Sequence, residues 1–228
     1  MRIGGIQKLT LTDYPGKVAC TVFLAGCNLR CPYCHNPGLV VPGGTECLSA
    51  DELFGFLSSR MGRLDGVCVS GGEPTINPEL PEFLRRIKEI GFSVKLDTNG
   101  TNPRMLDGIL RKGLADYVAM DVKNSPARYC ETCGGTDVLE AVRESVRLIM
   151  GCETPYEFRT TVCKNLHTAQ EMRGIGEWLC GAKLYFLQPF EDSGSIPGEG
   201  MLPPTPGEMR LFRQILLPYI PDTYIRGE

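Results

Sequence analysis

The chain has 228 residues and a formal net charge of −3, with 42% hydrophobic and 22% charged residues. This composition is ordinary for a globular protein, and the small negative charge gives no electrostatic reason to expect nucleic acid or an anionic membrane as a partner. No run approaches the roughly 18 apolar residues of a membrane span. The N-terminus also lacks the apolar core of a secretory signal, so we expect a cytoplasmic protein.

Short runs rich in Val, Leu, Phe and Tyr alternate with helical patterns along most of the chain. Six of these runs predict strands, over residues 18–25, 66–70, 93–98, 117–123, 156–163 and 183–189. Strand–helix alternation implies parallel strands joined by right-handed crossovers. Because six such units are too few for the usual eight-stranded barrel, we expect an α/β fold built as an open, partial (βα)6 barrel.

The predicted helices carry start signals of two kinds, capping boxes and an asparagine before a proline: Ser49 with Glu52, Thr168 with Glu171, Asn77-Pro78 and Asn102-Pro103. An apolar stripe at helical spacing runs over 80–90 and ends near Gly91. The tail is rich in Pro and Gly and predicts a loop, with a last helix over 206–217. We expect a single domain, with an N-terminal segment over 1–17, the partial barrel over 18–190, and a C-terminal loop and helix over 191–228.

Three of the eleven cysteines stand close together after the first predicted strand. Cys27, Cys31 and Cys34 lie on a loop with Gly and Pro, which can wrap a compact metal centre. Thiolates select zinc or iron–sulfur clusters, and three protein ligands leave one metal position open for a small molecule, as in catalytic sites. His35 could be a fourth ligand, although its position next to Cys34 would strain the geometry. A zinc knuckle, or free cysteines, is the alternative.

Glycines and charged residues stand at the ends of the following strands. The second strand ends in Gly71-Gly72-Glu73, whose glycines let the backbone approach a ligand closely. In the fourth strand Asp121 and Lys123 are two residues apart and therefore share a face. Charges directed into a barrel need partners, because burying charge is costly. A zwitterionic ligand with a ribose would supply them, and an Asp–Lys or Asp–Arg pair that seals the barrel is the alternative.

The carboxyl ends of parallel strands form one rim, where active sites of barrels lie. Arg159 in the fifth strand could pair bidentately with a carboxylate, and Gln188 lies near the end of the sixth. The strand ends therefore predict one site, formed with the cysteine loop by Gly71, Gly72, Glu73, Asp97, Thr98, Asn99, Asp121, Lys123, Arg159 and Gln188.

The spacing Cys27-x3-Cys31-x2-Cys34, with the aromatic Tyr33 before the third cysteine, resembles the signature of the radical S-adenosylmethionine (SAM) superfamily. The resemblance implies one [4Fe–4S] cluster held by the three thiolates, with SAM on the fourth iron through its amino and carboxylate groups. The resemblance also implies that an electron from the reduced cluster would cleave SAM to methionine and a 5′-deoxyadenosyl radical, which would abstract a hydrogen atom. The segment from Gly71 to Pro74 is similar to the family motif that receives the SAM amino group.

The opening from Ile3 to Lys17, and the extension Cys34-His35-Asn36-Pro37, are similar to the activating enzymes of glycyl radical enzymes, especially the anaerobic ribonucleoside-triphosphate reductase activating protein. That resemblance implies hydrogen abstraction from a glycine Cα of a partner enzyme, with reduced flavodoxin or ferredoxin as electron donor. It also implies which residues contact SAM or surround a monovalent cation. They are Asp97, Thr98, Asn99, Asp121, Lys123 and Arg159 for SAM, with Gln188 where a relative has a histidine, and Asp97, Thr98 and Asp121 for the cation.

Three other functions are open. One is a pyruvate formate-lyase-type activator, and another is an enzyme acting on a small molecule, such as a 7-carboxy-7-deazaguanine synthase-like protein. The third is a non-catalytic iron–sulfur electron carrier, which would leave the motifs at the strand ends unexplained.

Cysteines outside the loop have other predicted roles. Cys130 and Cys133 form a C-x2-C pair that could hold half of a second metal site, but no second such pair completes it. His167 is expected at the surface. Small buried residues are predicted at Cys20, Cys47, Cys68, Cys163 and Cys180.

Overall fold

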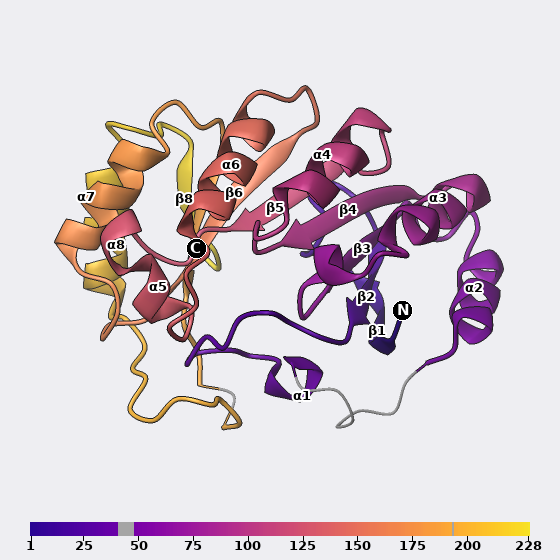
Figure 1. Ribbon diagram of the computed structural model, residues 1–228, viewed down its shortest axis with the longest axis horizontal. Coiled ribbons are helices and arrows are strands. Elements are labelled where there is room, and N and C mark those ends of the chain that lie inside the picture. The colour runs from indigo at the N-terminus through magenta and orange to yellow at the C-terminus, as the bar shows by residue number, and fades with distance from the viewer. Residues whose placement is uncertain (41–47, 193) are drawn as a thin grey trace.

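In the computed structural model, which describes residues 1–40, 48–192 and 194–228, eight strands form one sheet in chain order (Figure 1). The strands are β1 (Ile3–Thr10), β2 (Ala19–Leu24), β3 (Gly66–Gly71), β4 (Ser93–Thr98), β5 (Tyr117–Asp121), β6 (Tyr156–Val162), β7 (Tyr185–Pro189) and β8 (Thr223–Ile225). Only β1 and β2 are antiparallel, and all later neighbours are parallel. Because β1 and β8 are the two edges of this sheet, it is not a closed barrel, and the predicted α/β fold is confirmed.

All six predicted strands are present, and two edge strands were missed. β1 lies in the segment over 1–17, and β8 in the segment over 191–228. β1 pairs with one strand, β2, and this pairing has two register shifts, so the sequence of β1 lacks a clean alternation. β8 has three residues, too few for a recognisable period.

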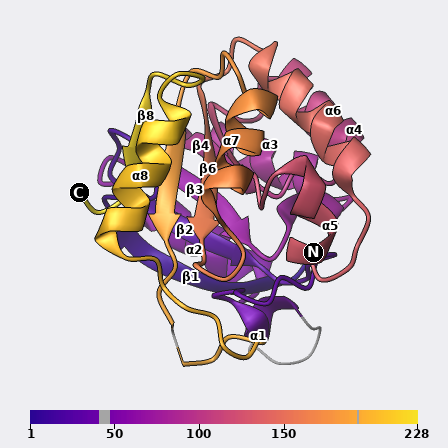
Figure 2. The same ribbon diagram turned by 90° about the vertical axis from the view of Figure 1, so that its left-hand side faces the viewer.

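The longer helices cover the outer face of the sheet (Figures 1 and 2). The α-helices are α1 (Pro37–Val40), α2 (Ala50–Ser59), α3 (Leu80–Ile90), α4 (Pro103–Arg111), α5 (Tyr129–Thr132), α6 (Leu139–Met150), α7 (Ala169–Trp178) and α8 (Pro206–Leu216). Two 3-10 helices, η1 (Pro74–Ile76) and η2 (Pro126–Arg128), precede α3 and α5. Every strand from β3 to β7 is therefore followed by a helical segment.

The predicted helix starts are confirmed except at Asn77. Ser49 and Thr168 form complete capping boxes, and Asn102 accepts a hydrogen bond from the amide of Met105. Asn77 instead donates its side-chain amide to the carbonyl of Pro74 and closes η1, so α3 starts only at Leu80. The local turn takes the side chain that would otherwise cap the helix.

The two faces of the sheet differ in chemistry. The outward residues are apolar and fully buried against the helices, as Val118 and Met120 on β5 illustrate. The inward residues of β4 are charged, because Lys95 and Asp97 form an ion pair at 1% and 9% exposure. The hydrophobic core therefore lies between the sheet and its helices, and the concave face is left to polar groups.

Two predictions about single side chains were wrong. Cys20, Cys68 and Cys163 are buried as expected, but Cys180 is exposed. His167 is 2% exposed rather than at the surface, because a turn folds its ring back against the sheet. Cys47 lies outside the described residues. No described helix is long and apolar enough to span a membrane.

Candidate active site

The cysteine loop begins directly after β2, and its first residues are tied to neighbouring segments by backbone hydrogen bonds. The amide of Gly26 donates to the carbonyl of Leu39 at 2.6 Å, and the amide of Glu73 donates to the carbonyl of Gly26 at 2.8 Å. A Cβ atom on Gly72 would lie 2.0 Å from the carbonyl oxygen of Gly26. Glycine at position 72 is therefore required for the close approach of the loop after β3 to the cysteine loop.

The middle of the loop is held by two segments that are distant in sequence. The amide of Arg30 donates to the carbonyl of Cys133 at 3.3 Å, next to Gly134, whose φ is +78°. The amide of Gly198, in the tail before α8, donates to the carbonyl of Pro32 at 2.8 Å. These contacts fix a loop that has no regular secondary structure of its own.

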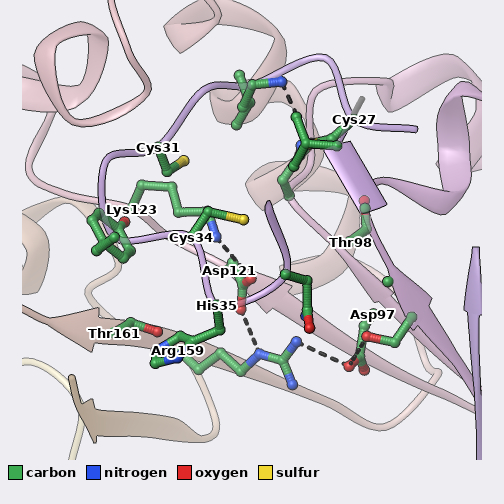
Figure 3. A pocket seen from close by; sticks show the side chains of 18 residues that line it. Cys27, Cys31, Cys34, His35, Asp97, Thr98, Asp121, Lys123, Arg159 and Thr161 are labelled. Carbon is green, nitrogen blue, oxygen red and sulfur yellow. Dashed lines mark hydrogen bonds and ion pairs between the residues drawn. The ribbon is translucent and has the colours of Figure 1, made fainter. Parts of the chain in front are cut away.

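One cavity gathers the predicted site residues at the carboxyl ends of β2 to β6 (Figure 3). It contains about 760 Å³ of space without protein atoms, part of it open to solvent. Predicted residues that line it are Cys27, Cys31, Tyr33, Cys34, Gly71, Gly72, Asp97, Thr98, Asn99, Asp121, Lys123 and Arg159. His35, which the sequence suggested only as a possible fourth metal ligand, also lines the cavity. The further lining residues, which sequence reasoning did not assign as binding residues, are Leu29, Asn36, Val40, Ser70 and Thr161.

Charged side chains form the floor of the cavity. Arg159 bridges the two carboxylates, with Nη2 at 3.0 Å from Asp97 Oδ2 and Nε bonded to Asp121. Lys123 Nζ lies 2.9 Å from Asp121 Oδ2, and Lys95 pairs with Asp97 from below. Figure 3 shows Arg159 reaching between the two aspartates. Among these five groups, three cations face two anions, which leaves the floor with an excess of positive charge.

Opposite charges decide the protonation of this floor. Burial alone would raise the pKa of Asp97, but Arg159 and Lys95 hold it below its ordinary value. Burial is likewise outweighed at Asp121, where Arg159 and Lys123 lower the pKa. The pKa of Lys123 is raised because Asp121 outweighs its burial. All of these groups are therefore charged at neutral pH.

Lys95 is a participant that sequence reasoning missed. Its position two residues before Asp97 on a strand was the available signal, since such residues share a face. The alternation of apolar and charged residues in Val94-Lys95-Leu96-Asp97 carries the same information.

Two predicted residues do not line the cavity. Glu73 is fully buried and accepts hydrogen bonds from the amide and hydroxyl of Thr75, from Thr98 Oγ1 at 2.7 Å and from the amide of Asn99 at 2.6 Å. Burial raises the pKa of Glu73. Its side chain thus ties the end of β3 to the end of β4 rather than facing a ligand. Gln188 pairs in register with Thr161 on β6 but is absent from the lining.

The thiols of the loop fit a thiolate-bound cluster in chemistry, although they do not converge on one point. In residues 1–40, 48–192 and 194–228, no three His, Cys, Asp or Glu side chains are grouped closely enough to hold a metal ion. The neighbouring Cys133 thiol holds the pKa of Cys31 below its ordinary value. Three soft donors that line one cavity nevertheless match the ligand set of an iron–sulfur cluster with one open position.

A buried hydroxyl in the same wall supports that fit. Tyr33 is 3% exposed, and its hydroxyl has no hydrogen-bond partner in the described part of the chain. A buried hydroxyl without a partner lowers the stability of the folded chain, because it has lost its hydrogen bonds to water. This indicates that the Tyr33 hydroxyl faces a polar group that occupies the cavity. The C-x2-C pair differs, since Cys130 is exposed while Cys133 is buried beside Cys31.

Comparison with known proteins gives a consistent result. Residues 21–165 match the family model described as the radical SAM superfamily. A Methanocaldococcus jannaschii protein, provisionally assigned as a glycyl-radical enzyme activating enzyme, is 32% identical over 231 residues, which cover 98% of this chain and 95% of that protein. The pyruvate formate-lyase-activating enzyme of Clostridium pasteurianum is 38% identical over 128 residues, covering 54% of this chain and 52% of that enzyme.

A solved structure agrees in fold. The radical SAM methyltransferase of Sphaerobacter thermophilus superposes with a TM-score of 0.71 at 18% identity, over 96% of this chain and 68% of that one. The chain therefore belongs to the radical SAM superfamily and is a radical SAM enzyme related to the activating enzymes of glycyl radical enzymes.

Proposed function

We propose that this enzyme abstracts a hydrogen atom from the Cα of a glycine in a partner enzyme and leaves a glycyl radical there. A [4Fe–4S] cluster with bound SAM would supply the radical chemistry. The residues of this chain bind and orient these groups, keep water from the reacting atoms and admit the substrate.

The cavity supports a definite assignment of roles. Cys27, Cys31 and Cys34 would hold the cluster. The backbone at Gly71 and Gly72, which lines the cavity, would receive the SAM amino group.

The charged floor would bind the rest of SAM. Arg159 and Lys123 supply the positive charge that a carboxylate needs, and Asp97 and Asp121 can accept from hydroxyl groups. Asn99 and Tyr33 line the same cavity. We also propose that Asp97, Thr98 and Asp121 surround a monovalent cation, and that Glu73 acts on SAM only through Thr98 and Asn99, which donate hydrogen bonds to it.

The closed floor is the observation that carries this proposal. Below Asp97 the concave face of the sheet is filled by Lys95 at 1% exposure and Glu157 at 0%, and the Tyr117 hydroxyl donates to Glu157 at 3.0 Å. Because these described side chains fill the space beneath the floor, a substrate would reach the cavity from its solvent-open side. A loop of a protein partner can present a glycine in this way.

The proposed partner is the anaerobic ribonucleoside-triphosphate reductase. The N-terminal pattern from Ile3 to Lys17, which contains β1, and the sequence Cys34-His35-Asn36-Pro37 support this choice. Pyruvate formate-lyase is the second candidate, because the Clostridium relative bears the name of its activating enzyme. Reduced flavodoxin or ferredoxin is the proposed electron donor. We further propose a single cytoplasmic domain over residues 1–228, without nucleic-acid or membrane partners.

Anaerobic reconstitution with iron and sulfide tests the proposal. The reduced protein is incubated with SAM and each candidate partner, while 5′-deoxyadenosine is measured by chromatography and a glycyl radical by electron paramagnetic resonance. We expect both signals with the correct partner and neither with Cys34→Ala. SAM cleavage without a radical on either partner would favour a small-molecule substrate, and a reducible cluster without SAM cleavage would favour an electron carrier.

A further inference from the structure

His167 is a buried histidine between two strand ends, and the proposed reaction does not use it directly. Its Nδ1 lies 3.0 Å from the amide nitrogen of Cys163, which follows β6. Its Nε2 lies 2.9 Å from the carbonyl oxygen of Lys123, which follows β5. The ring therefore joins the ends of two neighbouring strands at the side of the cavity.

The contacts of the ring together favour one tautomer. Nδ1 also lies 3.2 Å from the Cys163 carbonyl oxygen, but that oxygen already accepts from the amides of Leu166 and His167. The Cys163 amide is a donor, so Nδ1 accepts from it and carries no proton. The Lys123 carbonyl is an acceptor, so Nε2 carries the proton and donates it. Burial also lowers the pKa of His167, which favours this neutral form.

Lys123 is held from three directions. Its amide donates to the Tyr129 hydroxyl at 3.3 Å, its carbonyl accepts from His167, and its ammonium pairs with Asp121. Among the described residues, His167 is the one hydrogen-bond donor to the Lys123 carbonyl, so this bond would be lost without it. The backbone at 123 lies beyond the last residue of β5, so no strand pairing would hold it instead.

We propose that His167 is a positioning residue, which fixes the Lys123 backbone so that the ammonium stays over the cavity floor and binds the carboxylate of SAM. This inference rests on the proposed function, because it assumes SAM in the cavity. A purely structural role would be different, since the same hydrogen bonds could stabilise the fold without affecting the ligand.

Two conservative variants distinguish the hydrogen bond made by Nε2 from the one made by Nδ1. In His167→Gln the side-chain amide nitrogen can take the place of Nε2 and still donate to the Lys123 carbonyl. In His167→Asn the side-chain oxygen can take the place of Nδ1 and still accept from the Cys163 amide, but the bond to Lys123 is lost. Each variant keeps one hydrogen bond, so a purely structural role predicts similar effects.

The experiment measures the Kd for SAM on the anaerobically reconstituted protein, and the urea midpoint of the same chain without its cluster. We expect His167→Asn to weaken SAM binding about tenfold and His167→Gln to change it less than threefold. Equal SAM affinities in the two variants would overturn the inference, whatever their urea midpoints.

A double-mutant cycle gives a second readout, with the urea midpoint of each species showing that it is folded. With Lys123→Ala as the background, His167→Ala should not weaken SAM binding further, because the group that it positions is already gone. Additive losses would contradict a role through Lys123. Wild-type protein that carries its cluster but does not bind SAM would instead overturn the proposed function, and the inference with it.

Discussion

Two buried carboxylate regions, only one strand end apart, have opposite electrostatics. At the junction of β3 and β4, Glu73 accepts hydrogen bonds only from neutral donors, and its pKa is raised. On the cavity floor, Asp97 and Asp121 lie among three cations, and their pKa values are lowered. Burial acts in the same direction on all three carboxyl groups, so the partners decide the outcome.

This difference in hydrogen-bond partners distinguishes a carboxylate that holds the fold together from carboxylates that belong to the binding site. A carboxylate bound by two hydroxyls and two amides, as Glu73 is, holds two loops together and offers nothing to a ligand. The floor has an excess cation and hydrogen-bonding groups that face the cavity, so it can receive a charged ligand. Both regions carry motif residues, and only the surroundings show which of them face the cavity.

The largest expected effect is that of Arg159→Met on the floor. Removing the guanidinium leaves two buried carboxylates with one cation fewer, and breaking a buried ion pair costs about 3 to 5 kcal/mol. Urea unfolding measures this loss. Arg143→Met is the control, because its pair with Glu140 is exposed and should be worth less than about 1 kcal/mol. Equal losses in the two variants would show that the floor is not an interdependent network.

Glu73→Gln should have a smaller effect at neutral pH. The amide retains one acceptor oxygen but brings an N–H group to a place where only donors point, so we expect a loss of about 2 kcal/mol. Urea unfolding again provides the measurement, with Glu82→Gln on the exposed side of α3 as the control. A loss as large as that of Arg159→Met would mean that Glu73 belongs to the charged network after all.

The pH dependence of these losses should have opposite signs in the two regions. The pKa of Glu73 is raised in the folded chain, so its contribution to the free energy of unfolding is greatest at acid pH and is lost as the pH rises through that pKa. The loss of unfolding free energy caused by Glu73→Gln should therefore shrink from pH 4 to pH 7. The pKa of Asp121 is lowered in the folded chain, so its contribution to the free energy of unfolding is lost as the pH falls. The loss of unfolding free energy caused by Asp121→Asn should therefore grow from pH 3 to pH 5. Parallel curves would contradict the comparison.

The smallest expected effect concerns two buried tyrosines beside the floor. Tyr33 has an unpaired hydroxyl, whereas the Tyr129 hydroxyl accepts from the Lys123 amide. In the cluster-free chain, Tyr33→Phe should be neutral or stabilising by up to about 1 kcal/mol, and Tyr129→Phe should lose about 1 kcal/mol. Thermal unfolding of the two variants distinguishes these results. A destabilised Tyr33→Phe would show that the hydroxyl has a partner in the folded chain.

Much of the fold could be predicted because its signals are local. The six central strands are short apolar runs bounded by helix caps such as Ser49 and Asn102, and these patterns need no knowledge of tertiary contacts. The edge strands β1 and β8 could not be recognised, since one is irregular and the other has three residues. His167 was misplaced because its burial depends on a turn that brings it to Lys123, 44 residues earlier in the chain.

The sequence by itself determined the three thiols of the cysteine loop and the strand ends that carry Asp97, Asp121 and Arg159, because neighbouring residues and strand alternation set both. Only the tertiary structure decided which charges meet. Asp121 lies opposite Arg159 in the register of β5 and β6, and Lys95 reaches Asp97 beneath the cavity. Electrostatic energy depends on distance and burial, and only the assembled sheet fixes either one.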